Sequence, residues 1–204
     1  MKKLLFFVCS FLLINCAFAQ HIAVPPFKAN GSSGDNPFPS IKDYDLILAC
    51  RAYDGIAHQL IFNVLVLKSG HWQKLTATMP AQSVPLSVDE PTLKPVETTD
   101  ADCNTIYSGL NGAHLFTIAD DNALPKCNES LDVINGEKQT VTHSLEDGPE
   151  YRIWIVTPKK VRYLYYASPH FFAKFCPDNR DRANVVKIVD LLTKSWPVQV
   201  SKYE

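Results

Sequence analysis

The stretch LIFNVLVLKSGHWQKLTATM, residues 60–79, decides the fold class of this chain. Two apolar runs flank Ser69-Gly70, and glycine tolerates the positive φ that a tight two-residue turn requires. Such a turn pairs Leu67 with Trp72 and predicts a β-hairpin whose side chains alternate between two faces. We expect the first face to be core and the second to be half exposed. The first comprises Phe62, Val64, Val66, Leu75 and Ala77, and the second comprises Asn63, Leu65, Lys74 and Thr76, with Leu67 and Trp72 near the turn.

A second hairpin is predicted by YRIWIVTPKKVRYLYYA, residues 151–167. Pro158 cannot take the positive φ of a two-residue turn, so we expect a four-residue loop over Thr157–Lys160. The resulting register gives the strand pair one aliphatic face and one basic-aromatic face. The aliphatic face carries Ile153, Ile155 and Leu164, and the basic-aromatic face carries Arg152, Trp154, Tyr163 and Tyr165, with Lys159 and Lys160 at the tip.

The remaining pattern predicts shorter strands and loops. Residues 44–53 alternate as a strand that places Leu46, Leu48 and Cys50 on one face, and Asn135-Gly136 predicts a third tight turn. Residues 104–120 are interpreted as two short strands around a turn at 110–112. Residues 80–102 contain four prolines and are interpreted as a long surface loop with one short edge strand at 83–88.

Residues 180–194 form the only predicted helix, because Val185, Ile188, Val189 and Leu192 recur at helical spacing. Asp178 or Asn179 is the expected N-cap, and Trp196-Pro197 ends the helix. The fold class is therefore mainly β (α+β): an antiparallel β-sandwich or open barrel with one C-terminal helix. We expect residues 44–204 to form this single domain.

The N-terminus has the pattern of an export signal. Lys2 and Lys3 precede an apolar run over Leu4–Ile14, which is too short to span a bilayer, and Ala17-Phe18-Ala19 matches a signal peptidase site. We expect a signal peptide over residues 1–19, cleavage at Ala19-Gln20, and a secreted or periplasmic product without a transmembrane segment. Lipid anchoring at Cys16 is the alternative, and Asn15 disfavours it. Residues 20–43 are rich in Pro, Gly and Ser and predict a flexible segment.

Cys50, Cys103, Cys127 and Cys176 remain after signal cleavage. An even number of cysteines in an exported chain predicts two disulfides. Cys103 and Cys127 flank one strand-turn-strand segment, so we pair them and leave Cys50 with Cys176. There is no CxxC motif, which argues against zinc-ribbon or thioredoxin chemistry. Asn30 and Asn128 begin N-x-S/T sequons, whose use depends on the host.

Charge is uneven along the mature chain. Residues 20–149 carry 8 basic and 16 acidic residues, whereas residues 150–204 carry 10 basic and 5 acidic ones. Such asymmetry fits either an anionic partner for the C-terminal part or two parts that neutralise each other within one domain. A hydrophobic content of 46% supplies a sizeable core and excludes a disordered chain.

Motifs for catalysis and cofactors are weak. HExxH, GxSxG, GxGxxG and P-loop patterns are missing, so we expect neither a metal site nor a cofactor. A hydroxyl lies near a histidine in Ser168-Pro169-His170 and in Thr142-His143-Ser144. Acids are paired at Asp43/Asp45, Asp89/Glu90 and Asp120/Asp121, which a glycosidase could use, although such acids are more often solvated turn residues.

The basic-aromatic hairpin is the strongest functional feature. Aromatic rings beside cations form a platform for sugar rings or anionic polymers, so the site candidates are Arg152, Trp154, Tyr163, Tyr165, Lys159 and Lys160. The competing interpretation is that the C-terminal helix buries this face and Trp154 is core. The leading hypothesis is an exported, non-enzymatic binding or interaction module for an unknown extracellular or cell-envelope ligand, for which a glycan or an anionic polymer is a candidate and no nucleic acid is expected. The alternatives are a secreted hydrolase of an extracellular polymer and a purely structural or inhibitory domain.

Overall fold

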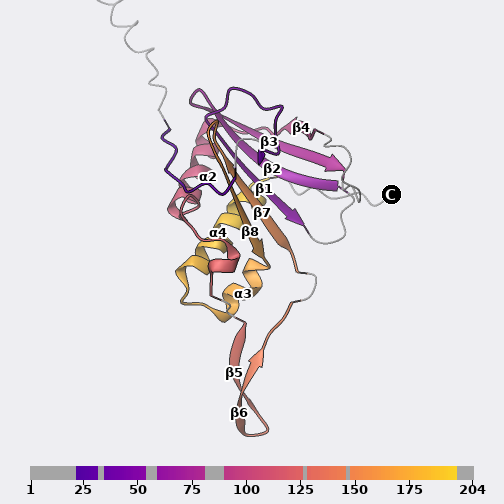
Figure 1. Cartoon of the computed structure of the whole chain (residues 1–204), viewed down its shortest axis with the longest axis vertical. Coiled ribbons are helices and arrows are strands. Elements are labelled where there is room, and N and C mark those ends of the chain that lie inside the picture. The colour runs from indigo at the N-terminus through magenta and orange to yellow at the C-terminus, as the bar shows by residue number, and fades with distance from the viewer. Residues whose placement is uncertain are drawn as a thin grey trace, which may run out of the picture.

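One antiparallel sheet of six strands, in the order β4-β3-β2-β1-β7-β8, forms the body of the protein. This computed structural model describes residues 22–31, 35–53, 59–80, 90–125, 128–145 and 148–196. The mainly β, α+β class is confirmed, with a single sheet and a separate two-stranded ribbon, β5-β6, in place of two stacked sheets (Figure 1). The strands are β1 Leu46–Tyr53, β2 Gln59–Lys68, β3 His71–Pro80, β4 Thr92–Pro95, β5 Glu129–Ile134, β6 Glu137–Thr142, β7 Glu150–Val156 and β8 Val161–Ala167.

The hairpin predicted over residues 60–79 is present as β2 and β3, with Leu67 opposite Trp72. Ser69 and Gly70 both take positive φ, at 50° and 82°. The expectation that its second face is half exposed is wrong for most of that face, because helices cover it. The buried members are Leu65, Leu67, Trp72, Lys74 and Thr76.

Two polar residues of that second face bond to the end of helix α4, Arg180–Lys194. Asn63 Nδ2 donates to Leu192 O at 2.9 Å. Lys74 Nζ donates to Ser195 O at 2.5 Å and lies 4.7 Å from the ring centroid of Trp196. Because buried polar groups must find partners, Asn63 and Lys74 are compatible with a core face here.

Helix α2, Asp100–Gly112, replaces the two short strands predicted around residues 110–112. Thr99 accepts a hydrogen bond from Asp102 N while the Asp102 side chain accepts one from Thr99 N, which is a capping box that starts the helix. Its apolar residues recur at helical spacing. The buried ones are Cys103, Ile106, Tyr107 and Leu110.

The predicted C-terminal helix is confirmed as α4, and Asn179 caps it by accepting from Arg182 N at 2.9 Å. A short helix that the sequence did not predict, α3, runs from Pro169 to Phe175. A single-turn 3₁₀ helix, η2, spans Asp121–Ala123. The buried stripe of α4 and the buried side of α2 share one core cluster with Ile153, Ile155 and Leu164, so these helices lie on one face of the sheet (Figure 1).

The N-terminal segment is packed where the sequence predicted flexibility. Phe38 is fully buried, and it belongs to a second core cluster with Ile47, Val156 and Val161 on the sheet face opposite the helices. Phe27 is 8% exposed. The expectation for residues 20–43 therefore fails at these two rings, because Phe38 packs over the central strands and Phe27 packs into the core cluster on the helix side.

Several predictions concern residues outside the described ranges. These are the signal peptide, the Cys16 anchor and the edge strand at residues 83–88; within residues 80–102, the edge strand that the structure describes is β4. Among the described residues, no helix is long and apolar enough to cross a membrane.

Both predicted disulfide pairings are wrong, because Cys50 and Cys103 are free thiols. Cys50 lies in the middle of central strand β1, and Cys103 points from α2 into the same core cluster. Burial raises the pKa of Cys50 to about 12, so this thiol stays protonated. Cys176, at the C-terminal cap of α3, is disulfide-bonded.

Candidate ligand-binding face

The register of β7 and β8 places the predicted aromatic and basic residues on one face. Arg152 lies directly opposite Tyr165, and Trp154 lies directly opposite Tyr163. Directly opposed residues of an antiparallel pair point to the same side, and all four side chains are half-buried. Their neighbours Ile153, Ile155 and Leu164 are at most 1% exposed on the other side. The predicted division of this hairpin into two faces is confirmed.

Helix α4 does not cover this face. Its buried stripe packs with Ile153, Ile155 and Leu164, whereas Trp154 packs against the second cluster that contains Phe62 and Phe38. The competing interpretation, in which the C-terminal helix covers Trp154, is therefore wrong about the position of the helix. Trp154 is half-buried by its neighbours within the sheet and not by α4.

Three rings form a row across the sheet from β2 to β8. Phe62 and Trp154 have ring centroids 5.5 Å apart, and Trp154 and Tyr163 have centroids 5.2 Å apart with an interplanar angle of 58°. Tilted contacts at this separation are favourable because of the ring quadrupoles. Burial raises the pKa of Tyr163, so its hydroxyl stays neutral and can donate a hydrogen bond at physiological pH.

Two arginines lie beside this row. Arg51 on β1 is directly opposite Arg152 on β7, a position in which like charges repel. Arg152 Nη2 is 3.5 Å from Glu150 Oε2, and its guanidinium carbon lies 6.0 Å from the ring centroid of Tyr165. Tyr165 in turn donates to Glu150 Oε1 at 2.8 Å. The aromatic–arginine face, as we call it below, comprises Arg51, Arg152, Trp154, Tyr163 and Tyr165.

Of the two lysines predicted at the hairpin tip, Lys159 is exposed and Lys160 is engaged by the N-terminal segment. Lys160 Nζ donates to Phe27 O at 2.5 Å and lies 4.0 Å from the ring centroid of Phe27, so this cation holds the N-terminal segment. Lys159 is exposed. The predicted four-residue loop is present, since Val156 pairs with Val161 and Thr157 N donates to Lys160 O.

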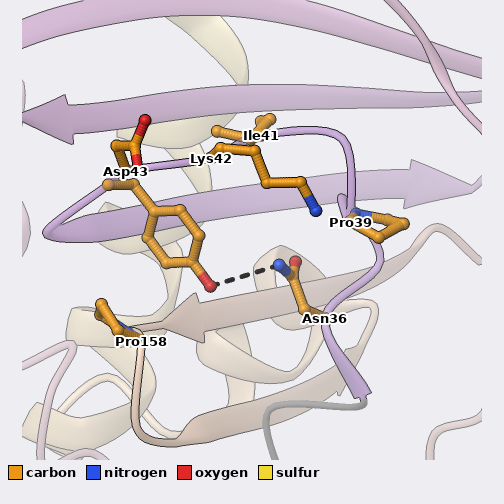
Figure 2. Close-up of a pocket in the computed structure, with 7 residues that line it drawn as sticks. Asn36, Pro39, Ile41, Lys42, Asp43 and Pro158 are labelled. Atoms are coloured by element: carbon orange, nitrogen blue, oxygen red, sulfur yellow. Dashed lines mark hydrogen bonds between the residues drawn. The ribbon is translucent and has the colours of Figure 1, made fainter.

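A pocket of about 510 Å³ lies at the tip end of the same hairpin (Figure 2). The sequence does not predict this pocket, because its walls come mainly from residues 36–43, which lie in the segment expected to be flexible. Phe38 N donates to Asn36 Oδ1 at 2.9 Å, and Asn36 Nδ2 donates to Tyr44 Oη at 3.4 Å, so the wall is internally bonded. The lining residues are Asn36, Pro39, Ile41, Lys42, Asp43, Tyr44 and Pro158.

The pocket combines ring surface with charge. Tyr44, Pro39 and Pro158 supply apolar planes, and Figure 2 shows the exposed Lys42 side chain extending over the pocket between Pro39 and Asn36. Its volume falls within the roughly 300–1,000 Å³ of ligand pockets.

The paired acids that sequence reasoning offered to catalysis have structural partners. Asp45 Oδ2 accepts from Ser69 N at 2.8 Å, and Asp43 lies 3.5 Å from Lys68. Asp120 Oδ2 accepts from Tyr165 N at 2.9 Å, and Asp121 pairs with Arg182. Of the third pair, Asp89/Glu90, Asp89 lies outside the described residues and Glu90 is exposed.

The two hydroxyl–histidine candidates are also engaged in packing. His143 stacks on Phe175 with centroids 4.3 Å apart, and its Nε2 is 2.7 Å from Ser130 Oγ. His170 Nε2 is 2.8 Å from Asp190 Oδ1, while Ser168 is 5% exposed at the turn into α3. Within the described ranges, no three His, Cys, Asp or Glu side chains are grouped to hold a metal.

Comparison with known proteins finds no match to a family model, a curated protein or a solved structure.

Proposed function

We propose that this chain is an exported, non-enzymatic binding module whose aromatic–arginine face takes an anionic glycan. The observation that supports it most is the register of β7 and β8, which brings Trp154 and Tyr163 into ring contact beside Arg152 on the sheet face opposite the helices. An aromatic plane next to a guanidinium group offers stacking and charge to the same ligand.

The arginines select for an anion. A guanidinium group binds a carboxylate or sulfate through two parallel hydrogen bonds. Arg152 is positioned for this role by the Glu150 carboxylate and the Tyr165 ring.

The pocket at the hairpin tip favours a linear polysaccharide chain as the ligand over a single sugar. Trp154 lies two residues before the end of β7, about 7 Å along the strand from Val156, and Pro158 lies in the loop that follows. A ligand chain that stacks on Trp154 and runs toward the hairpin tip reaches the pocket, where Lys42 supplies a further cation. An acidic polysaccharide therefore fits the surface better than a compact ligand.

A hydrolase needs two groups at the ligand that act as acid and base, and the described residues of this face do not supply a suitable pair. Glu150 is the carboxyl group on the face among the described residues, and it is bonded to both Arg152 and Tyr165. A carboxylate fixed in this way positions its neighbours. Export, which the proposal also assumes, is supported by the signal-like residues 1–19.

A binding screen tests this proposal. Immobilised acidic and neutral polysaccharides are probed with the purified mature chain, and the same polymers are assayed for release of reducing ends. We expect salt-sensitive binding to acidic polymers without release of reducing ends. Cleavage of any polymer favours the hydrolase alternative, and indifference to every acidic polymer contradicts the proposal.

A further inference from the structure

The β5-β6 ribbon projects from the body as an arm (Figure 1). Its six residue pairs run from Glu129–Thr142 at the base to Ile134–Glu137 at the tip. In the described part of the chain, neither strand pairs with a third one. An isolated two-stranded hairpin is only marginally stable in water, so an arm of this kind requires further contacts.

Exposed apolar side chains are concentrated in this arm. The large hydrophobic residues exposed in the described chain are Leu131 at 74%, Val133 at 68%, Leu145 at 45% and Ile134 at 41%. Three of these four lie on β5, and the fourth follows β6. Of these, Leu131 and Val133 lie two residues apart on one face of β5, and neighbouring exposed apolar side chains on a folded protein mark an interaction site.

The two faces of the arm differ. One face docks onto the body at its base, where Ser130 bonds to His143 and His143 stacks on Phe175 of α3. Strand alternation puts Leu131 and Val133 on the opposite face, which points away from α3. This outer face comprises Glu129, Leu131, Val133, Lys138, Thr140 and Thr142, and all of them are exposed.

We infer that the outer face of the arm docks against the outer face of a second copy of this chain, with the two arms antiparallel. A two-fold interface brings the same patch together from both subunits, so the patch must complement itself. The outer face does so: it is apolar in the middle at Leu131, basic at the tip at Lys138 and acidic at the base at Glu129. In an antiparallel pair, Leu131 meets the partner's Leu131, and each Lys138 reaches the partner's Glu129.

The size of the arm sets the strength of the contact. A six-residue strand is about 20 Å long, so two arms bury much less than the roughly 800 Å² per partner of a stable complex. We therefore expect weak, concentration-dependent dimers. Such dimers carry two aromatic–arginine faces, which would strengthen attachment to a polymer by avidity if the proposed function holds.

Sedimentation velocity of the mature chain over a wide concentration range tests the inference without any ligand. We expect the sedimentation coefficient to rise with concentration, and Leu131→Lys to abolish the rise. Lys138→Glu alone should weaken association, and Lys138→Glu combined with Glu129→Lys should restore it. Lys174→Glu, an exposed charge change on α3, is the matched control and should leave association unchanged.

Each remaining outcome contradicts the inference. If the chain stays monomeric at every concentration, the arm does not bind a second copy, and a different protein is its partner. Association that survives Leu131→Lys, or that the double charge reversal fails to restore after Lys138→Glu weakened it, places the contact elsewhere. Circular dichroism melts confirm that the variants fold, and because the substituted residues are exposed we expect unchanged midpoints.

Discussion

Asn30 pairs with the backbone of Tyr163 through both ends of its side-chain amide. Its Oδ1 accepts from Tyr163 N at 2.7 Å, and its Nδ2 donates to Tyr163 O at 2.7 Å. Gly31 bridges to Val161, and Asp120 Oδ2 accepts from Tyr165 N. These groups occupy the outer edge of β8, which would otherwise offer unpaired backbone groups to another strand. They also fix the strand that carries two of the proposed binding residues.

Replacement of this amide should loosen the β8 edge. We expect Asn30→Ala to lower the free energy of unfolding by about 1–2 kcal/mol, because two hydrogen bonds are lost and Tyr163 is left with unpaired backbone groups. Denaturant unfolding measures the change. Asn111→Ala, at an exposed position near the end of α2, is the control and should change little.

An Asn30 variant as stable as the parent protein contradicts this role. The same pairing bears on the sequon at Asn30, because its Nδ2 already bonds to Tyr163 O. In a host that glycosylates exported proteins, we therefore expect mass spectrometry of the folded protein to find Asn30 unmodified.

The buried ion pair between Arg182 and Asp121 should dominate the attachment of α4 to η2. Arg182 is 2% exposed, its Nη1 lies 2.5 Å from Asp121 Oδ1, and its Nη2 donates to Pro125 O at 2.8 Å. Asp121→Ala leaves this guanidinium buried without its carboxylate, so we expect a loss of about 3–5 kcal/mol. Asp181→Ala, an exposed acid one residue from Arg182, is the control. Equal thermal midpoints for the two variants would show that the pair contributes nothing.

Asp100 should make stability depend on pH in the acid range. A hydrogen bond from Trp72 N, followed by the contact with His71, lowers the pKa of this carboxyl. A lowered folded pKa contributes stability that is present above the unfolded value of about 3.9 and is lost as pH falls through the folded pKa. Asp100→Asn should therefore flatten the acid limb of unfolding free energy against pH.

The contribution of Asp100 is modest, because the side chain is 48% exposed and solvent screens it. The difference between parent and Asp100→Asn should be largest near neutral pH and should vanish at the acid end. Glu137→Gln, an exposed change on β6, should leave the curve parallel to that of the parent. A difference that grows as pH falls has the wrong sign and rejects the assignment.

The cysteines should separate into two classes in thiol labelling. Burial raises the pKa of both Cys50 and Cys103, so both should resist alkylation in the folded protein and react after unfolding. Cys176 should react only after reduction. With Cys50 and Cys103 free, we predict Cys127 as its partner in the mature chain. Non-reduced peptide mapping that links Cys176 to Cys50 or Cys103 contradicts this pairing.

The strands of this fold could be predicted from local sequence because each hairpin carries its own turn chemistry. Gly70 and Gly136 take positive φ at the turns, and Pro158 requires the longer loop that the structure has. Strand alternation alone was enough to predict which side chains of β7 and β8 share a face. Helix α2 was not predicted because Asn111-Gly112 was interpreted as a tight turn between strands, whereas Thr99 and Asp102 form a capping box that starts a helix.

The sequence predicted the part of the candidate site on β7 and β8 but neither Arg51 nor the pocket. The aromatic–arginine face lies on one hairpin, so local register determines most of it, whereas Arg51 joins it only through the pairing of β1 with β7. The pocket depends on how the segment around Phe38 packs against the sheet, and a Pro- and Gly-rich composition carries no such information. Both disulfide predictions failed because sequence spacing does not determine which cysteines become core residues.

The most direct test of the central claim is the affinity of Trp154→Ala for an acidic oligosaccharide identified in the polysaccharide screen, measured by calorimetry. Aromatic stacking contributes about 1–3 kcal/mol per group, so we expect binding to weaken by roughly tenfold or more. Phe171→Ala, a half-buried ring on α3, is the control and should bind like the parent. Trp154 is half-buried, so Trp154→Ala should also keep a near-parental melting midpoint. Truncation of a fully buried tryptophan would instead cost about 3–5 kcal/mol and lower the midpoint clearly. A Trp154→Ala protein that binds as tightly as the parent, or that unfolds, contradicts the account.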